Sequence, residues 1–484
     1  MLGSSFRRFS LALALALAFS AKARGSEFFV SPSGSADGDG NVGNPWSLAF
    51  ALSQPAAVKS GDTIWLRGGI YEGSFVSVLT GSPDAPIIVR QYLGEHATLD
   101  GGQANVAALL TVGGSYTWYW GFELMSSSSS SRVLSQSGSS PVGLNRPNEG
   151  IGIDQGEPHP GLKFINLIIH DLGQGFGLWK EAIDADVYGC LIYYNGWTAP
   201  DRGHGHGIYV QNLTGTKRIT NNIIFSNFSH GVQAYGSQAA PLDNIDIESN
   251  TMFENGMPGD YQRNVLVGGG SVAQNPRVLN NSFYYPGSSG QNLNIGYDPY
   301  GVGAANPVIM DNYIVNGDNA FSPLNTNVTM TGNTFYTSIP ELIQNLFPSN
   351  EYLPERPTAT RVFVKPNRYE PGRAYITVFN WTSDPTISVD LSNLLLPGAP
   401  YEVRDAQDYF RGPIIAGSFS GSRIELPMTN PTIAAPAGFD LPLPDTADLR
   451  VFVLRWRPPI HVDRPPLKPI RPGRRPPSNR RDLS

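Results

Sequence analysis

A short unit recurs along this chain: Asn or Gly, followed by a strand-like apolar run. Its copies begin at Asn166, Gly189, Asn222, Asn250, Asn281, Asn312 and Asn333, which lie 21 to 33 residues apart. A second series of short strands, beginning at Gly150, Gly177, Gly207 and Gly231, interleaves with the first. Two short strands per period of this length are typical of a β-solenoid, in which each turn buries its apolar face against the next. The sequence therefore predicts an all-β solenoid with the Asn side chains stacked inward as a ladder.

The amino-terminal segment adds a resemblance to a known family. It contains Phe29-Val-Ser-Pro-Ser-Gly34, Asn44-Pro-Trp46 and Gly61-Asp-Thr-Ile-Trp-Leu-Arg-Gly-Gly-Ile-Tyr71. This pattern resembles the amino-terminal cap of right-handed parallel β-helix proteins of the pectate-lyase-like superfamily. The resemblance implies a right-handed parallel β-helix whose open end is plugged by a capping helix. It implies little about activity, because this superfamily hosts many chemistries.

Changes in composition divide the chain into five segments. Residues 1–23 have a basic start, an apolar run and a small-x-small site, which predicts a signal peptide. We expect the β-helix at 27–345, a linker at 346–360 and a small β-sandwich at 361–457, where alternating strands follow one another at short spacing. Residues 458–484 contain eight Pro and seven Lys or Arg, and predict a disordered tail.

Charge and targeting signals restrict the partners that we expect. The chain carries a net charge of −6 although both of its ends are basic, so the body between them is acidic and unsuited to nucleic acid. The signal peptide predicts a secreted or periplasmic protein, and no apolar run is long enough to span a membrane. We expect a monomer. The basic tail is either solvated or a contact to anionic surface polymers.

Strand alternation predicts an outward stripe of side chains that could bind sugar. If Leu178, Ile208 and Val232 point inward, then Trp179, Tyr209 and Gln233 point outward on consecutive turns. Aromatic faces pack on the C–H faces of sugar rings, and an amide bonds hydroxyls. The alternative is ordinary packing of these aromatic rings under a loop.

A histidine-rich stretch is the densest candidate for chemistry. The segment Asp201-Arg-Gly-His-Gly-His-Gly207 places His204 and His206 between glycines. We expect His230 on the next turn and Glu149 two turns below, in the same column. These His side chains could transfer protons, ligate a metal or form a structural ladder. Arg202 could neutralise the carboxylate of an acidic sugar.

Asp184 and Asp186 are a second candidate pair. At positions i and i+2 they share one face of a strand, if this stretch is extended. Two such carboxylates could serve a glycosidase as acid and base, bind a cation or simply be solvated. No motif supports calcium or another metal, and the chain has a single cysteine, Cys190. We therefore predict no cofactor.

Two functions remain open from the sequence. The first is a carbohydrate-active enzyme that cleaves or modifies an extracellular polysaccharide on the outer face of the β-helix. A lyase would use His204, His206 or His230 as a base, and a hydrolase would use the two aspartates. The second is a non-catalytic polysaccharide-binding or cell-surface structural protein that uses the same aromatic stripe.

Overall fold

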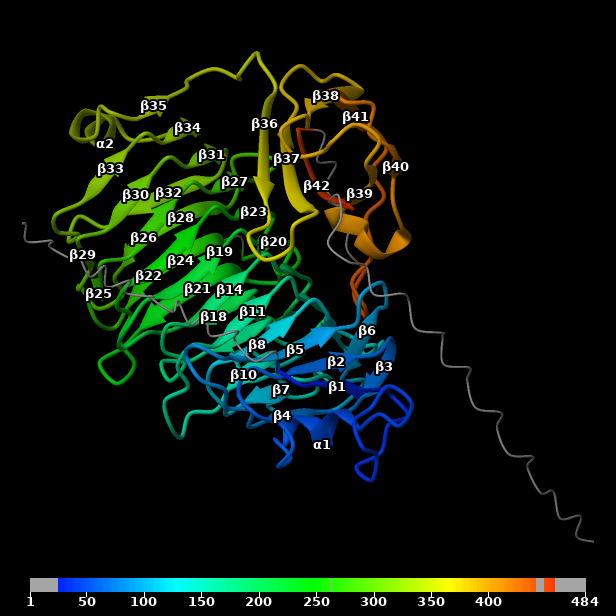
Figure 1. Cartoon of the computed structure of the whole chain (residues 1–484). Coiled ribbons are helices and arrows are strands. Elements are labelled where there is room, and N and C mark those ends of the chain that lie inside the picture. Colours follow the sequence, from blue (N-terminus) through cyan, green and yellow to red (C-terminus); the bar gives the residue numbers. More distant parts are fainter. Residues whose placement is uncertain (1–24, 262, 441–447, 458–484) are drawn as a thin grey trace, which may run out of the picture.

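Three parallel sheets run the length of a solenoid in the computed structural model, which describes residues 25–261, 263–440 and 448–457 (Figure 1). The predicted signal peptide and tail lie outside these residues. In each full turn the chain passes from the nine-stranded sheet, which we call sheet B, to sheet A and then to sheet C, each of eleven strands. The turns climb from the blue amino-terminal strands to the yellow-green ones in Figure 1.

Within each sheet the strands follow one another in space in chain order. Sheet A contains β1 (Glu27–Val30), β2 (Thr63–Leu66), β5 (Ile87–Gln91), β8 (Thr117–Trp120), β11 (Lys163–Ile165), β14 (Asp186–Tyr188), β19 (Lys217–Thr220), β22 (Ile245–Glu248), β26 (Arg277–Leu279), β30 (Val308–Met310) and β33 (Thr329–Thr331). Sheet B contains β4 (Phe75–Ser77), β7 (Ala108–Val112), β10 (Glu149–Ile153), β13 (Phe176–Leu178), β18 (Ile208–Val210), β21 (His230–Gly236), β24 (Arg263–Gly269), β28 (Gln291–Tyr297) and β32 (Asp318–Phe321). Sheet C contains β3 (Gly69–Glu72), β6 (Ala97–Asp100), β9 (Glu123–Met125), β12 (Ile168–His170), β15 (Leu191–Tyr193), β20 (Ile223–Phe225), β23 (Thr251–Phe253), β27 (Ser282–Tyr284), β31 (Tyr313–Val315), β34 (Thr334–Tyr336) and β35 (Glu351–Tyr352).

Each full turn holds three strands, so the prediction of two per turn was wrong. The sequence pattern missed sheet A because its strands run into sheet C through a turn of only two residues. Between β19 and β20, for example, Asn221 turns the chain with a φ of 56° and Asn222 follows it. Asn tolerates this left-handed conformation better than most residues, so the corner needs no longer loop.

The predicted ladder is confirmed at this corner for five of the six Asn copies; Asn166 lies outside it and bonds Glu370 and Asn367 instead. Asn222, Asn250, Asn281, Asn312 and Asn333 are buried on successive turns. In each step the side-chain amide and the backbone N–H of one Asn donate to the side-chain oxygen of the next, at 2.8 to 3.0 Å. The ladder therefore satisfies buried polar groups at every turn.

The core of the solenoid is a continuous apolar stack. In sheet B the residues Ile151, Phe176, Ile208, Val232 and Val265 are in register and fully buried. At the amino-terminal end the helix is only α1 (Leu48–Leu52), with Leu48, Ala51 and Leu52 buried in the core. It is a five-residue segment, so the structure shows no capping helix of the expected kind. A second short helix, α2 (Glu341–Leu346), lies near the other end (Figure 1).

An antiparallel module follows the solenoid. Its five-stranded sheet has the order β36 (Arg361–Pro366), β37 (Arg373–Phe379), β42 (Leu449–Trp456), β39 (Pro400–Asp405) and β40 (Ile415–Ser418). The pair β38 (Thr386–Asp390) and β41 (Arg423–Pro427) shares an apolar cluster with one face of this sheet. A 3₁₀ helix, η1 (Ala406–Arg411), follows β39.

The module packs against the outer face of sheet C, beside the upper turns in Figure 1. Outward aromatic side chains of sheet C meet Tyr375, Phe379 and Trp381 in one buried cluster. The Trp381 indole N–H donates to the Tyr313 hydroxyl at 2.8 Å, and the hydroxyls of Thr251 and Thr377 are also 2.8 Å apart. This contact fixes the module on the solenoid.

Candidate functional site

A pocket of about 460 Å³ lies on the outer face of sheet B. Its lining includes seven of the ten side chains singled out in the sequence: Glu149, Trp179, Arg202, His204, His206, Tyr209 and Gln233. We call this pocket the sheet B groove. The remaining three, Asp184, Asp186 and His230, are not among its lining residues.

One wall of the groove is an insertion between β9 and β10, residues 126–148, which contributes Ser139 and Pro141. Two fully buried arginines hold this insertion against the solenoid. Arg132 bonds the Asp171 carboxylate at 2.9 Å, and Arg146 donates to the Asp171 carbonyl at 2.8 Å. A second wall comes from the two-stranded antiparallel pair β16 (Trp197–Thr198) and β17 (Gly203–His204).

Glu149 places its carboxyl group over two glycines. A Cβ atom added to Gly177 would lie 2.3 Å from the Glu149 Oε2, and one added to Gly152 would lie 2.5 Å from it. Only residues without a side chain leave this space on consecutive turns. Burial raises the pKa of Glu149 to about 8, although a hydrogen bond from Trp179 opposes the rise. The group is therefore largely protonated at neutral pH.

The aromatic pair forms, but not by the predicted register. Gly177, not Trp179, pairs with Tyr209 on the next turn, and Tyr209 pairs with Gln233. The prediction placed Leu178 two positions out of register, because Phe176 is the residue that stacks with Ile208. Trp179 follows the end of β13 and still reaches Tyr209, with ring centroids 5.2 Å apart.

His204 has an orienting partner. Its Nε2 lies 3.2 Å from the Asp201 Oδ1, and its ring stacks on Trp197 with centroids 5.3 Å apart. A carboxylate can only accept, so Nε2 carries the proton and Nδ1 of the neutral ring stays unprotonated. Burial lowers the pKa of His204 against the opposing effect of Asp201. His204 is thus a neutral imidazole with one lone pair available.

His206 and His230 contact each other, as predicted for consecutive turns. The Nδ1 atoms of the two rings are 3.2 Å apart, and the His230 backbone N–H points to the His206 Nδ1 at 3.3 Å. Burial lowers the pKa of His206 to about 3 and that of His230 well below its usual value. His206 lines the groove, whereas His230 is buried, does not line it and contacts Tyr261.

Asp184 and Asp186 do not form the predicted pair. Asp184 has a φ of 53°, so this stretch is not extended and the two carboxylates do not share a strand face. Asp184 accepts a hydrogen bond from the Thr216 N–H at 2.8 Å. Asp186 begins β14 in sheet A and pairs with Arg368 of the carboxy-terminal module at 2.8 Å. The extended stretch on which the predicted acid–base pair depended is therefore absent.

Arg202 stays at the edge of the groove. Its side chain donates to the Gly203 carbonyl at 3.0 Å and lies over the Tyr261 ring, 5.1 Å from the centroid. A guanidinium in this position can meet an anionic group that enters the groove. Among the described residues, no group of three or more His, Cys, Asp and Glu side chains is placed to hold a metal ion.

Sequence reasoning gave too little weight to two residues that contact His204. Trp197 and Asp201 belong to the same antiparallel pair and its turn, and each contacts His204. Their signal was present in the insertion after Asn195, where Trp, Pro, Asp and Gly surround the His residues. The glycines at positions 152 and 177 were a further signal, because their missing side chains leave room for the Glu149 carboxyl group above the sheet.

The stacking of one strand per sheet in every full turn decides the fold. The three stacked parallel sheets are typical of a right-handed parallel β-helix, the fold that the resemblance of the amino-terminal segment implied. No family model matches this β-helix protein, and no curated protein matches it. Among the described residues, no helix is long and apolar enough to cross a membrane.

Solved structures similar to this β-helix include lyases and a hydrolase. A pectate lyase, Pel9A, is 18% identical with a TM-score of 0.45, covering 64% of this chain and 78% of that one. A rhamnogalacturonan lyase is 15% identical with a TM-score of 0.49, covering 66% and 90%. A glycoside hydrolase is 9% identical with a TM-score of 0.42, covering 67% and 99%.

Proposed function

We propose that this protein binds an acidic polysaccharide in the sheet B groove and cleaves it by β-elimination. One observation carries the proposal: a single pocket holds the neutral His204, the protonated Glu149 and Arg202 beside the Trp179 and Tyr209 rings. Elimination needs a base, an acid and a group that stabilises the sugar carboxylate. These three roles match the three polar side chains.

In the proposed reaction, His204 Nδ1 removes the proton on the sugar carbon next to the carboxylate. The electron pair of that C–H bond forms a carbon–carbon double bond, and the bond to the leaving glycosidic oxygen breaks. Glu149 gives its proton to that oxygen. Arg202 stabilises the negative charge that develops on the sugar carboxylate. Solvent then restores the proton on Glu149 and removes the one on His204.

Hydrolysis has less support in this groove. An inverting or retaining glycosidase of the usual kind needs two carboxyl groups across the scissile bond. The lining of the groove contributes one, Glu149, since Asp184 and Asp186 lie elsewhere. Binding without catalysis is the second candidate, favoured by the Trp179 and Tyr209 rings and by Gln233 on the next strand.

The test is a screen of the full chain against acidic and neutral polysaccharides, recording the ultraviolet absorbance of unsaturated ends together with new reducing ends. We expect both signals on an acidic polymer, and a loss of at least about 100-fold in kcat for His204→Gln and for Glu149→Gln, a size typical of lost acid–base catalysis. Asp184→Asn is the matched control. The φ at position 184 suits Asn, so this variant should fold normally. The activity of the variant should equal that of the parent chain.

Other outcomes decide against elimination. Reducing ends without ultraviolet absorbance would indicate hydrolysis. Retention of a polymer without cleavage, weakened by Trp179→Ala but not by His204→Gln, would indicate a binding protein.

Export and domain limits remain proposals that rest on the sequence. The signal peptide at residues 1–23 and the tail at 458–484 fall outside the described residues, so a secreted or periplasmic location is inferred from their composition alone. We also propose the limits 27–345, 346–360 and 361–457 for the solenoid, linker and β-sandwich; the linker then contains β35, which pairs with β34 of sheet C.

A further inference from the structure

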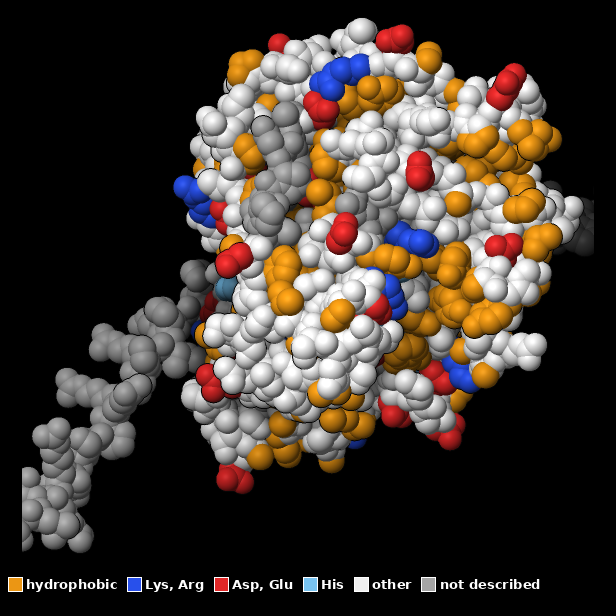
Figure 2. Space-filling view, turned by 180° about the vertical axis from the view of Figure 1, so that it is seen from behind, with side chains coloured by type: hydrophobic (Ala, Val, Ile, Leu, Met, Phe, Trp, Pro, Cys, Tyr) orange, Lys and Arg blue, Asp and Glu red, His pale blue; other side chains and the backbone are white. Residues whose placement is uncertain are grey.

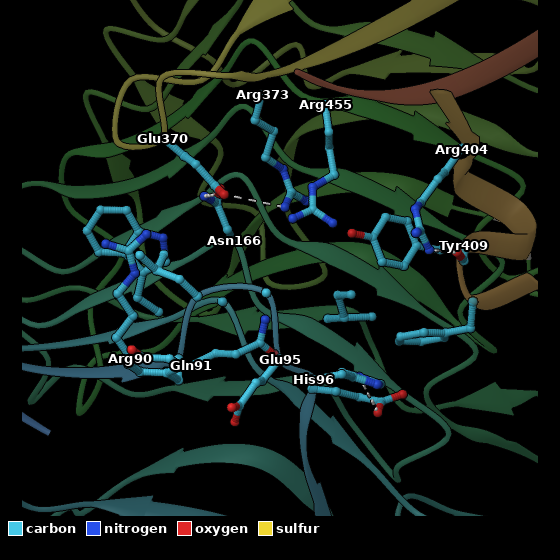
Figure 3. Close-up of a pocket in the computed structure, with 18 residues that line it drawn as sticks. Arg90, Gln91, Glu95, His96, Asn166, Glu370, Arg373, Arg404, Tyr409 and Arg455 are labelled. Carbon is cyan, nitrogen blue, oxygen red and sulfur yellow. Dashed lines mark hydrogen bonds and ion pairs between the residues drawn. The ribbon is translucent and has the colours of Figure 1, made fainter. Parts of the chain in front are cut away.

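A second pocket, of about 340 Å³, lies between the β-helix and the carboxy-terminal module. We call it the interdomain pocket. In Figure 3, Arg373, Arg404 and Arg455 extend into it from the module, and Arg90 and His96 face them from the solenoid. It is separate from the sheet B groove, with which it shares no lining residue.

Two of its arginines are held opposite each other. Arg373 of β37 and Arg455 of β42 are directly paired in antiparallel register. Like charges in this arrangement destabilise a sheet unless something negative lies nearby. Glu370 is 3.8 Å from Arg373, and Glu402 is 3.4 Å from Arg455. The buried Nε of Arg373 has no hydrogen-bond partner among the described residues.

The acids around the pocket do not balance its arginines. Glu402 serves both Arg404, at 2.9 Å, and Arg455. The lining acid Glu95 is already held by Arg67, outside the lining, at 2.7 Å. Each of these carboxylates therefore already pairs with an arginine, and Glu402 pairs with two.

Arg90 adds a further positive charge. Its guanidinium stacks on the Trp120 ring, 3.8 Å from the centroid, and has no hydrogen-bond partner among the described residues. Burial lowers the pKa of Arg90, with Glu370 opposing the change, but an arginine stays charged near neutral pH. Its donors are thus available to a ligand.

The mouth of the pocket has an aromatic surface. His96 and Phe410 stack with ring centroids 5.0 Å apart, and both side chains are partly exposed. His96 is fixed from below by the buried carboxylate of Glu123, whose oxygen lies 3.1 Å from its Nε2. An aromatic face beside guanidinium groups suits a sugar ring that carries a carboxylate.

We propose that the interdomain pocket binds a carboxylated mono- or disaccharide, with its carboxylate between the guanidinium groups and its ring against Phe410. The volume of the pocket fits a ligand of that size. The ligand would contact the solenoid through Arg90 and the module through Arg404 and Arg455, so binding also holds the two parts together. This proposal does not depend on the elimination reaction.

The test is calorimetric titration of the full chain with digalacturonate, with the neutral galactose disaccharide and with sodium sulfate as probes. We expect digalacturonate to bind and the other two to bind at least about tenfold more weakly. Arg455→Gln and Arg404→Gln should each weaken digalacturonate binding at least about tenfold, in line with the strength of charge-assisted hydrogen bonds. Arg277→Gln, an exposed arginine on sheet A, is the matched control.

The sheet B groove could bind the same probe, so Trp179→Ala is measured in parallel. A signal that is lost in Trp179→Ala but kept in Arg455→Gln and Arg404→Gln would overturn the proposal. Equal binding of sulfate would also overturn it, by showing a site for small anions only. A thermal melt of each variant without ligand checks that the variant is folded. A loss of binding supports the proposal when the melting temperature is unchanged. If elimination fails while the arginine variants still lose binding, the interdomain site stands alone.

Discussion

At the scale of single residues, two groups in the sheet B groove have pKa values shifted in opposite directions. Burial raises the pKa of Glu149 to about 8 and lowers that of His204 below its usual value. Both shifts have the same cause, because a buried site disfavours the charged form of either group. At neutral pH the same pocket therefore holds a protonated carboxyl group and a neutral imidazole.

This pair predicts a bell-shaped dependence of activity on pH. The proposed elimination requires neutral His204, so the acid limb should lie below pH 6.5, the ordinary value for histidine. The proposed elimination also requires protonated Glu149, so the alkaline limb should fall near pH 8. The measurement is kcat/KM on the cleaved polymer from pH 4 to 10. An alkaline limb absent up to pH 10 would contradict the role of Glu149.

The corners between sheets A and C decide stability at the scale of elements. Each ladder asparagine both accepts and donates across turns. Asn281 accepts from the backbone and the side chain of Asn250, and its amide donates to the Ile247 carbonyl and to Asn312. Such buried groups have no water to replace a lost partner.

We therefore expect Asn281→Ala to destabilise the protein by about 3 kcal/mol, because it leaves several buried donors and acceptors unpaired. Urea unfolding followed by circular dichroism measures this change. The matched control is Asn105→Ala at an exposed position, which should stay within about 0.5 kcal/mol of the parent. A cost below about 1 kcal/mol for Asn281→Ala would show that the ladder contributes little.

At the scale of the whole molecule, the carboxy-terminal module covers an apolar strip. Sheet C turns Tyr193, Phe225, Phe253 and Tyr313 outward, and these side chains are buried in one cluster with residues of the module. A strip of stacked aromatic rings left in water would favour association. The elongated solenoid and the module are thus one unit in terms of stability. The face in Figure 2 carries only scattered Lys and Arg side chains, so it offers no continuous basic surface.

A chain that ends at residue 360 should therefore aggregate. Removing the module uncovers the sheet C strip, and we expect high-molecular-weight species in size-exclusion chromatography with light scattering. A chain that ends at residue 457 keeps the module and should elute as the parent does. A well-behaved 1–360 fragment of the expected mass would show that the solenoid does not need this cover.

The sequence by itself determined what depends on neighbouring turns. The ladder from Asn222 to Asn333, the inward Ile208 and Val232 and the contact between His206 and His230 all follow from a repeat that stacks like on like. The sequence also predicted that the seven groove residues share one outer face, but with an error in register. These residues line one pocket because outward positions of adjacent turns share a face. The prediction succeeded for them even though it placed Leu178 out of register.

Tertiary structure alone decided the rest. Asp184 left its expected face because its φ is 53°, a local conformation that strand alternation cannot foresee. Arg90 and Arg455 meet in one pocket although hundreds of residues separate them, because the module docks on sheet C through aromatic packing. A repeat fixes contacts between adjacent turns, whereas a contact between two modules depends on how their surfaces fit. That is why the groove could be anticipated from the sequence and the interdomain pocket could not.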